Sequence, residues 1–290
     1  MNKSIIKNTL FILTIALFTS CEDKIDLSLD KGFEQLTVEA VLNTDTTLQR
    51  VILRGSVPFF DDISTTPAID NAIVNVISNT NDTFPFTFTA KGEYWLNASP
   101  TKKFELGKSY ELQIDLGGEK YYAKSEVNPV ALWDSLTYEY LPATGFAPEG
   151  YYATMHARDI PGVGQCYWFR RYENGIFASG PVDINTAYDA GSNPGEFDGE
   201  AFSFPNSVGG VNDFDEPYEI NDTLRIEIQG ISPDFYYFLD EITTQMENEG
   251  LFAAPPANVR TNIINRDPDG RAGLGYFVIG EMEAREVVIK

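Results

Sequence analysis

The chain has 290 residues, with 43 Asp and Glu, 21 Lys and Arg, one His and two Cys, and a formal net charge of -22. This charge repels the phosphate backbone of nucleic acids, and no Lys/Arg cluster offers a local exception, so nucleic acid is not an expected partner. Aromatic residues make up 13% of the chain, too many for a disordered chain of low hydrophobicity and high charge, so we expect it to fold.

The first twenty residues are typical of a secretory signal peptide. Lys3 and Lys7 precede an apolar run at residues 9–18. The run has about half the length that a helix needs to cross a bilayer, which favours a cleaved signal over a retained transmembrane anchor. We therefore expect the signal peptide to comprise residues 1–20.

Small residues before Cys21 resemble the lipobox of bacterial lipoproteins. Thr19 and Ser20 come directly before Cys21, and in such sequences the signal peptidase cleaves before the Cys, whose thiol carries diacylglycerol. We predict lipidation at Cys21 and anchoring in outer-membrane lipid. Phe18 departs from the pattern, because Leu is commoner there, and an ordinary signal peptide with an incidental Cys is the alternative.

Acidic residues follow the predicted lipid site directly. Glu22 and Asp23 resemble the short acidic signal that exports lipoproteins of Bacteroidota to the outer face of the outer membrane. We expect residues 21–33 to be a flexible tether and the protein to face the cell surface, although a merely solvated tether predicts the same letters.

Short alternating segments broken by turn residues follow the tether. Alternation of apolar and polar residues with a period of two predicts strands. The predicted strands are 36–42, 49–54, 72–77, 84–89, 109–115 and 120–126. Turn residues at 92–96, 106–112 and 116–122 separate them. This spacing predicts an immunoglobulin-like β-sandwich over residues 34–128.

The remainder, residues 129–290, predicts a second β-rich domain with one amphipathic helix. Its predicted strands are 132–140, 151–158, 165–172, 223–230, 275–280 and 286–289. The helix is predicted over 232–249, with Ser232 as N-cap and Pro233 at the first helical position. Its apolar face is expected to pack on the second sheet.

Residues 175–217 are predicted to form a long irregular loop. The segment is rich in Gly, Asn, Asp and Pro, and irregular segments of this length are uncommon unless they are functional or disordered. We therefore predict a partner-binding or ligand-binding loop. Its candidate contact residues are Tyr188, Phe197, Phe202 and Phe204. The alternative is that these rings cover the sheet beneath the loop.

The residues of common catalytic and metal sites are scarce. His156 is the only imidazole, which excludes a His-rich metal site, and the Gly-x-Ser-x-Gly motif of a nucleophilic Ser is missing. Cys166 lies in an aromatic strand, where a small buried hydrophobe is favoured over a catalytic Cys. The acidic segments 213–216 and 267–270 have oxygen ligands at a spacing that calcium prefers, but a turn is favoured.

No cofactor, no metal and no catalytic residue are therefore predicted. Carboxylates are so abundant that no pair can be singled out for glycoside hydrolysis, and a carboxylate-dependent hydrolase is the alternative in the enzyme class.

Three tripeptides look like the acceptor sequence for protein O-glycosylation in Bacteroidota. The candidate acceptors are Thr46, Ser135 and Thr223, each directly after an Asp. We predict that at least one is occupied, and an intact mass of the mature native protein without a sugar increment would reject this.

The most specific sequence segments lie in the C-terminal half. Segments 231–239, 255–263 and 275–277, with 36–42 after the tether, resemble the signature of a widespread family of Bacteroidota outer-membrane lipoproteins defined by a domain of unknown function. The resemblance covers nearly all of the mature chain. It implies a location and partners but no catalytic residues, since members are often encoded beside TonB-dependent receptors. The insertion at 265–270 departs from the family's pattern.

The signal and the resemblance together predict a surface-exposed lipoprotein that is a non-enzymatic accessory subunit of an outer-membrane β-barrel complex. A TonB-dependent transporter is the first expected partner. The alternatives are a subunit of a barrel-assembly or secretion machine, and a stand-alone lipoprotein that binds a glycan or a peptide. Lipid anchoring confines the protein to the membrane plane, where even a weak contact gains from a high effective concentration.

Overall fold

The fold is mainly β, as predicted, with 53% of the residues in strands. The structure is a computed structural model, which describes residues 34–58, 66–99, 101–145, 147–188, 199–204, 211–213, 216–248, 255 and 257–290. Residues 34–290 belong to one compact unit. Among the described residues, no helix combines the length and the apolar character needed to cross a membrane.

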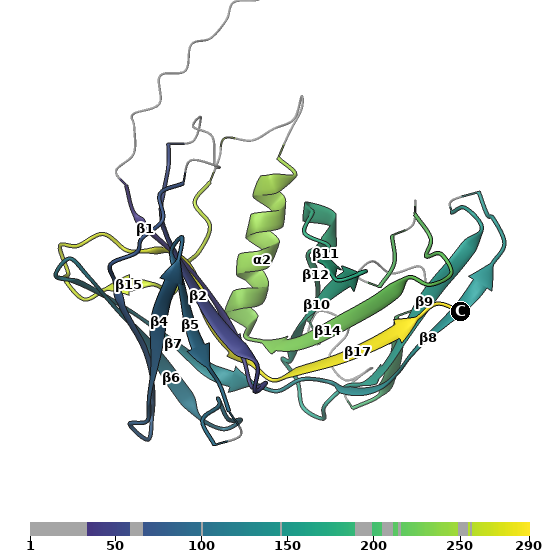
Figure 1. Cartoon of the computed structure of the whole chain (residues 1–290), viewed down its shortest axis with the longest axis horizontal. Helices are drawn as coiled ribbons and strands as arrows, with labels where there is room; N and C mark the ends of the chain where they lie inside the picture. The colour runs from purple at the N-terminus through teal and green to yellow at the C-terminus, as the bar shows by residue number, and fades with distance from the viewer. Residues whose placement is uncertain are drawn as a thin grey trace, which may run out of the picture. The chain divides into compact units, whose positions relative to one another are not determined.

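The first sheet is built mostly from the N-terminal strands (Figure 1). These are β1 (Leu36–Asn43), β2 (Leu48–Gly55), β3 (Ile73–Ser78), β4 (Thr83–Ala90), β5 (Glu93–Asn97), β6 (Ser109–Leu116) and β7 (Glu119–Asn128), joined by β15 (Ile264–Asn265) and β16 (Leu274–Gly280) from the C-terminal half. The strand order is β15-β7-β16-β1-β2-β5-β4-β3-β6, and β6 also pairs with β7. The strands from β7 to β6 therefore form a closed ring.

This ring replaces the predicted immunoglobulin-like sandwich over residues 34–128, which the structure does not show. A sandwich consists of two separate sheets, whereas here one continuous set of pairings returns to its start. The reason is β16, which lies between β1 and β7 and runs parallel to both. The sequence pattern of 34–128 contains no sign of a strand that arrives from the other end of the chain.

Alternation along the strands fills the inside of the ring. In β1 the side chains of Leu36, Val38, Ala40 and Leu42 are buried, while the residues between them are less so. Phe277 of β16 joins the same buried cluster and is fully buried. The ring therefore encloses a packed hydrophobic core.

The second set of strands forms two further sheets. One contains β10 (Cys166–Glu173), β11 (Ile176–Phe177), β12 (Asn185–Tyr188), β14 (Thr223–Ile231) and β17 (Met282–Val288), and the other contains β8 (Leu132–Leu141), β9 (Gly150–Arg158) and β13 (Ala201–Phe204). Tyr167 and Phe169 of the first sheet share a hydrophobic core with Trp133 and Met155 of the second. The two sheets are thus the walls of one core.

The helix α2 (Pro233–Met246) begins as predicted. The Ser232 side chain accepts a hydrogen bond from the Phe235 N–H, and Pro233 occupies the first turn. Phe235, Phe238 and Leu239 are buried. The helix ends before the predicted residue 249, because the N–H of Glu247 bonds back to the Thr243 and Gln245 carbonyls and tightens the last turn.

Three other elements differ from their predictions. The segment at 92–96 was expected to be a turn, but Tyr94 and Leu96 are buried at alternate positions and form β5. The final strand begins at Met282, before the predicted residue 286, because it pairs with β14 along its whole length. The segment 175–217 contains β11, a 3₁₀ turn at Pro181–Asp183, β12 and β13, so much of its described part is regular.

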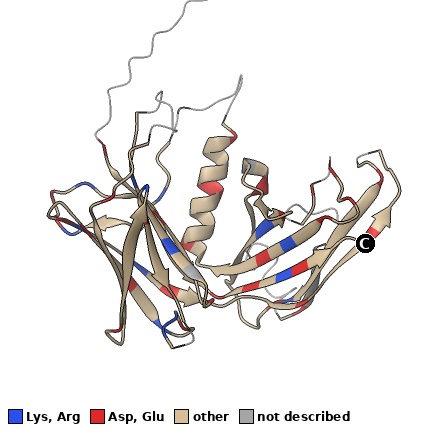
Figure 2. Cartoon of the chain, in the orientation of Figure 1, with Lys and Arg blue, Asp and Glu red and all other residues tan. Residues whose placement is uncertain are grey.

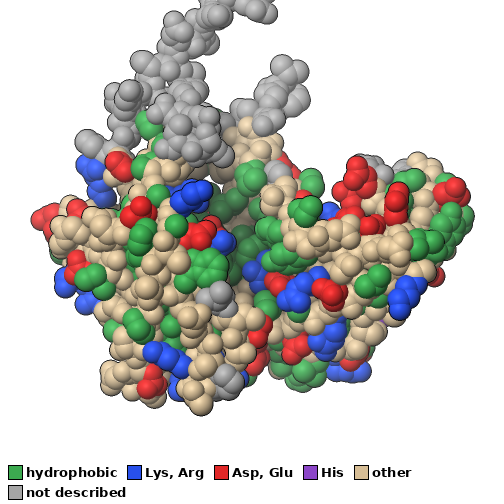
Figure 3. Space-filling model, viewed as in Figure 1, with side chains coloured by type: hydrophobic (Ala, Val, Ile, Leu, Met, Phe, Trp, Pro, Cys, Tyr) green, Lys and Arg blue, Asp and Glu red, His purple; other side chains and the backbone are tan. Residues whose placement is uncertain are grey.

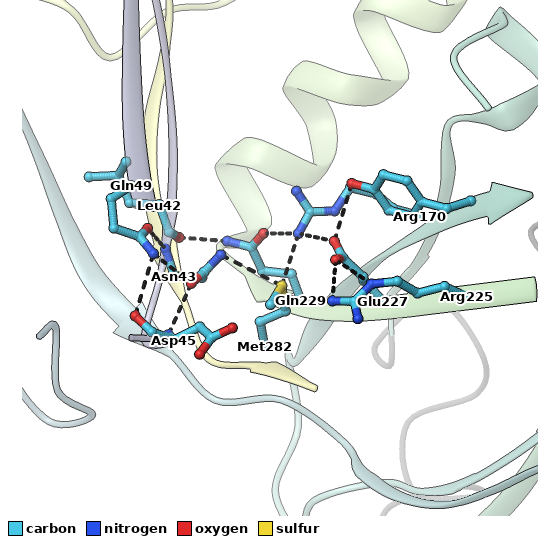
Figure 4. A network of polar contacts seen from close by, with 10 residues as sticks. Leu42, Asn43, Asp45, Gln49, Arg170, Arg225, Glu227, Gln229 and Met282 are labelled. Atoms are coloured by element: carbon cyan, nitrogen blue, oxygen red, sulfur yellow. Dashed lines mark hydrogen bonds and ion pairs between the residues drawn. The ribbon is translucent and has the colours of Figure 1, made fainter. Parts of the chain in front are cut away.

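A buried polar network joins the ring to β14 (Figure 4). Gln229 is fully buried, and its Nε2 donates to the Leu42 carbonyl at 2.7 Å. Its Oε1 accepts from Nη2 of Arg170 at 2.8 Å, and that guanidinium also pairs with Glu227 at 3.3 Å. Since buried amides need partners, these bonds fix how β1 meets β14.

Two glycines allow the backbones to approach closely at the same junction. A Cβ on Gly280 would lie 1.8 Å from the Gly230 carbonyl oxygen, and a Cβ on Gly230 would lie 2.0 Å from the Pro129 carbonyl oxygen. Both contacts are with backbone, which cannot rotate away. Glycine is therefore required at both positions.

Candidate functional site

The candidate site is a cleft of about 750 Å³ where β8, β9, β10 and the segment before β14 meet. Its lining residues are Tyr140, Glu149, Gly150, Tyr151, Glu173, Glu216, Pro217, Tyr218, Glu219, Ile220 and Asp222. Among these described residues, five are acidic and none is Lys or Arg. We call this hollow the acidic cleft.

Two tyrosines from a hairpin form one wall of the acidic cleft. Tyr140 lies near the end of β8 and Tyr151 near the start of β9, and these residues pair across the hairpin. Their ring centroids are 5.2 Å apart with an interplanar angle of 77°, an edge-to-face contact. The Tyr140 side chain is 55% exposed, so an aromatic surface remains open beside the carboxylates.

The opposite wall is held to the hairpin by backbone contacts. The N–H of Tyr218 donates to the Tyr151 carbonyl at 3.0 Å, and the Tyr218 hydroxyl donates to the Val211 carbonyl. Burial raises the pKa of the Tyr218 hydroxyl, although the nearby Arg171 opposes this. A Cβ on Gly150 would lie 2.5 Å from the Pro217 side chain, so this close contact of the walls depends on glycine.

Arg171 lies behind the acidic cleft and is committed to other partners. It donates from Nη2 to Asp183 at 3.1 Å and from Nη1 to Glu173 at 3.5 Å, and it is 3.9 Å from Asp213. Its side chain is only 10% exposed. Because one buried cation faces three carboxylates, it cannot neutralise the five acids of the lining.

The electrostatics of the cleft follow from this excess of carboxylates. Burial, together with the charges of Asp222, Glu216 and Asp213, raises the pKa of Glu173 against the lowering effect of Arg171. Desolvation and the Glu149 carboxylate raise the pKa of Tyr140. Residues 129–290 carry 26 acidic and 9 basic residues, against 13 and 8 in residues 34–128, so the field here is negative.

Figure 2 shows Asp and Glu on strand ends and loops near the C-terminus, and Figure 3 shows acidic beside hydrophobic side chains at this end of the molecule. Such a surface attracts an organic cation, since carboxylates pair with Lys or Arg and ring faces stabilise them further. Among the residues that the structure describes, no group of three or more His, Cys, Asp and Glu is arranged to hold a metal ion.

The predicted binding loop is only partly described. Phe197 lies outside the described residues, and only the backbone is described for Phe202 and Phe204, which belong to β13. Tyr188 is half-buried, and its ring lies 5.3 Å from Tyr236 and 6.1 Å from Tyr237 of α2. The structure therefore places Tyr188 against the helix and not in the acidic cleft.

The predicted lipid site and export signal, Cys21, Glu22 and Asp23, lie outside the described residues. The three candidate glycosylation sites belong to different elements: Thr46 is exposed between β1 and β2, whereas Ser135 in β8 and Thr223 at the start of β14 are half-buried. Their occupancy stays a prediction.

The remaining candidate residues from the sequence, His156, Cys166 and segment 267–270, make contacts that support the fold. His156 of β9 lies 3.2 Å from the Thr137 hydroxyl and 2.8 Å from the Ser203 hydroxyl, so its ring joins neighbouring strands. Cys166 is buried, as predicted, and its Sγ donates to the Gly164 carbonyl at 3.9 Å. In the segment 267–270, the Asp269 N–H donates to the Asp267 side chain at 3.0 Å, which is a turn.

Sequence reasoning missed the acidic cleft. Its residues come from four separate stretches. Only Glu216 and Pro217 belong to segments that were singled out, the predicted loop 175–217 and, for Glu216, the calcium candidate 213–216. The available signal was the density of acids around Tyr218, but nothing in the sequence brings Tyr140 and Glu149 to the same place.

Comparison with known proteins identifies the family. The model named "Domain of unknown function (DUF4249)" matches residues 22–285. The chain therefore belongs to the DUF4249 family, in agreement with the predicted membership of a family defined by a domain of unknown function. A search of the curated proteins finds no match.

Proposed function

Starting from this family membership, we propose that the protein is a non-enzymatic accessory subunit that holds a positively charged segment of a partner protein. The observation that carries the proposal is the acidic cleft, in which five carboxylates and exposed aromatic surface converge without a Lys or Arg in the lining. Such a site attracts a basic side chain over several ångströms and orients it by hydrogen bonds.

The proposed location is the outer face of the outer membrane, with the lipid on Cys21 as the anchor and Glu22 and Asp23 as the export signal. This part of the proposal is supported by the sequence pattern of residues 1–23. A lipid-anchored protein meets other membrane proteins in two dimensions, so a cleft of modest affinity is enough for a lasting complex.

The proposed partner is an outer-membrane β-barrel, first a TonB-dependent transporter. The resemblance to Bacteroidota lipoproteins supports this choice. A barrel-assembly or secretion machine is the alternative machine, and capture of a free cationic peptide or a glycan by the protein alone is the alternative activity, since the same cleft has the volume for a short ligand.

The test is mild-detergent extraction from native membranes with a C-terminal tag on the full chain. The wild type is expected to co-purify with one barrel protein in about equal amounts. A triple variant neutralises three exposed acids of the cleft through Glu149→Gln, Glu216→Gln and Glu219→Gln. It is expected to lower recovery of the barrel at least tenfold, because the attraction for the basic segment is lost.

The matched control removes the same charge from exposed positions on the ring, through Glu39→Gln, Glu105→Gln and Glu126→Gln. This variant is expected to retain the barrel. Equal loss in both variants would mean that only net charge matters, and the cleft would have no special role. A wild-type protein that purifies without any partner would overturn the accessory-subunit proposal and favour direct ligand capture.

A further inference from the structure

A seam separates the two edge strands β8 and β17. Within the described part of the chain, β17 pairs only with β14 and β8 only with β9, although all four strands contribute to one hydrophobic core. Both edge strands lie wholly within the described residues. They run in the same direction, since Arg285 contacts Trp133 and Lys290 contacts Tyr138 further along.

The seam is held by the shared hydrophobic core and by contacts between side chains and backbone. Nη2 of Arg285 donates to the Trp133 carbonyl at 3.4 Å, and the guanidinium lies 5.8 Å from the centroid of the Trp133 ring. At the other end the Lys290 N–H donates to the Tyr138 hydroxyl at 3.1 Å. By contrast, β17 pairs with β14 from Met282 to Val288 without interruption. Opening the seam therefore breaks no backbone ladder.

The edge of β17 that faces the seam carries backbone groups that take no part in the pairing with β14. The backbone groups of Glu281 and Ile289, which flank β17, point to β14. The Gly230 N–H donates to the Glu281 carbonyl, and the Ile289 N–H donates to the Asp222 carbonyl. Because the direction alternates along a strand, Met282, Ala284, Glu286 and Val288 point to the seam. The Ala284 carbonyl accepts a bond from Nη1 of Arg285 at 2.9 Å, in agreement with this.

A buried donor on the other side of the seam also lacks a partner. Trp133 of β8 is only 7% exposed, and its indole Nε1 has no hydrogen-bond partner among the described residues. A buried N–H without an acceptor costs free energy. A carbonyl on a segment added at the seam would be an acceptor within this neighbourhood.

Each end of the seam opens into a hollow. At the start, a pocket of about 370 Å³ is lined by Leu132 and Trp133 of β8 and Met282, Glu283 and Arg285 of β17. Leu132 is 62% exposed there. At the far end lies the acidic cleft, which contains Tyr140 of β8 and Asp222, the residue whose carbonyl accepts from Ile289.

The geometry defines the occupant. Cα atoms of β8 and β17 come within 8 Å of each other, so an added strand that bonds to both must part them to about 9.5 Å. Such a strand must have two free edges, which excludes an edge strand of a second folded copy. The distance from Leu132 to Tyr140 corresponds to about eight extended residues, or about 27 Å. The acidic cleft at one end requires a Lys or Arg at that point of the added segment, and the pocket around Leu132 and Trp133 accepts an apolar side chain at the other.

We propose that the seam between β8 and β17 is a β-augmentation site for an isolated extended segment of the partner protein, with an apolar residue at one end and a Lys or Arg about eight residues away. This inference rests on the proposed function and names its binding mode. Main-chain bonds to the seam supply affinity, and the two hollows supply specificity.

The test uses Glu286→Pro in the tagged full chain, with Glu286→Thr as the matched control. Proline removes the N–H that faces the seam and no ladder bond to β14, whereas threonine changes the same side chain and keeps the N–H. Glu286→Pro is expected to lower co-purification of the barrel at least tenfold with a melting temperature near that of the wild type. Glu286→Thr is expected to retain the barrel.

A second measurement does not depend on the variant folding. Amide exchange of the wild-type protein, alone and in the purified complex, is expected to show slower exchange at Ala284 and Glu286 in the complex. Unchanged exchange, or full recovery of the barrel with Glu286→Pro, would overturn the seam while leaving the accessory role intact. A wild-type protein without any barrel would overturn both.

Discussion

The ring and the core between the two smaller sheets, here called the two-sheet core, differ in how their edge strands are paired. In the ring every strand from β7 to β6 has a neighbour on both sides, and even the C-terminal β16 is held between β1 and β7. In the two-sheet core, β8 and β17 meet without pairing. The comparison teaches that backbone pairing is complete where the molecule has a purely structural core and incomplete next to its acidic cleft.

The largest expected effect breaks the ring through its core. Phe277→Ala should lower the free energy of unfolding by about 3–5 kcal/mol, because Phe277 is fully buried in β16 and the change leaves a cavity. Urea denaturation followed by tryptophan fluorescence measures this. Phe177, which is 40% exposed, is the control, and Phe177→Ala should cost less than about 1 kcal/mol. Equal losses of unfolding free energy in the two variants would show that the burial of Phe277 does not set the size of the effect.

A smaller effect is expected at the junction between the ring and β14. Gly280→Ala should destabilise the protein by roughly 2–3 kcal/mol, because its Cβ would meet the Gly230 carbonyl at 1.8 Å. Gly145→Ala is the control, since a Cβ there has no described atom within 4 Å. Thermal melting of both variants checks this, and an unchanged melting temperature for Gly280→Ala would show that the backbones can separate freely.

The seam between β8 and β17 sharpens the comparison, because weakening it should lower the free energy of unfolding only slightly. Arg285→Gln should reduce the free energy of unfolding by less than about 1 kcal/mol, as expected for a partly exposed side chain with few contacts. A loss in urea denaturation as large as that of Phe277→Ala would mean that the seam is a structural joint.

The smallest expected effect is the pH dependence of the acidic cleft. Burial raises the pKa of Glu173 above the ordinary value of 4.5, so the folded state binds this proton more tightly than the unfolded state does. The unfolding free energy should therefore fall as pH rises from 4.5 through the raised pKa. Glu173→Gln should flatten this part of the profile in urea titrations. If the unfolding free energy of the wild type instead rose relative to that of Glu173→Gln as the pH rises, the predicted direction of the pH dependence would be wrong.

Much of the local structure follows from the sequence, because alternation and capping are local signals. The buried positions of β1 and the Ser232 cap of α2 were predictable from neighbouring letters. The closure of the ring was not, since β16 reads as a strand but its parallel neighbours β1 and β7 lie far away in sequence. Pairing partners depend on the whole chain and leave little trace in a short window.

The candidate site was predictable to a lesser degree. An acidic surface follows from composition, but the acidic cleft needs Tyr140, Tyr151 and Tyr218 to meet, and that depends on a backbone bond between β9 and the segment before β14. The aromatic residues between 175 and 217 were singled out because they lie in a polar, irregular segment. Tyr188 serves to cover a helix, which shows that an aromatic in a polar segment does not by itself mark a site.

The position of β16 has a consequence for biosynthesis. Since Thr37 near the start of the ring pairs with Leu274, the ring cannot close until almost the whole chain has emerged from the ribosome. Contacts so distant in sequence slow folding. The same strand order that stabilises the finished protein therefore delays closure of the ring until synthesis is nearly complete.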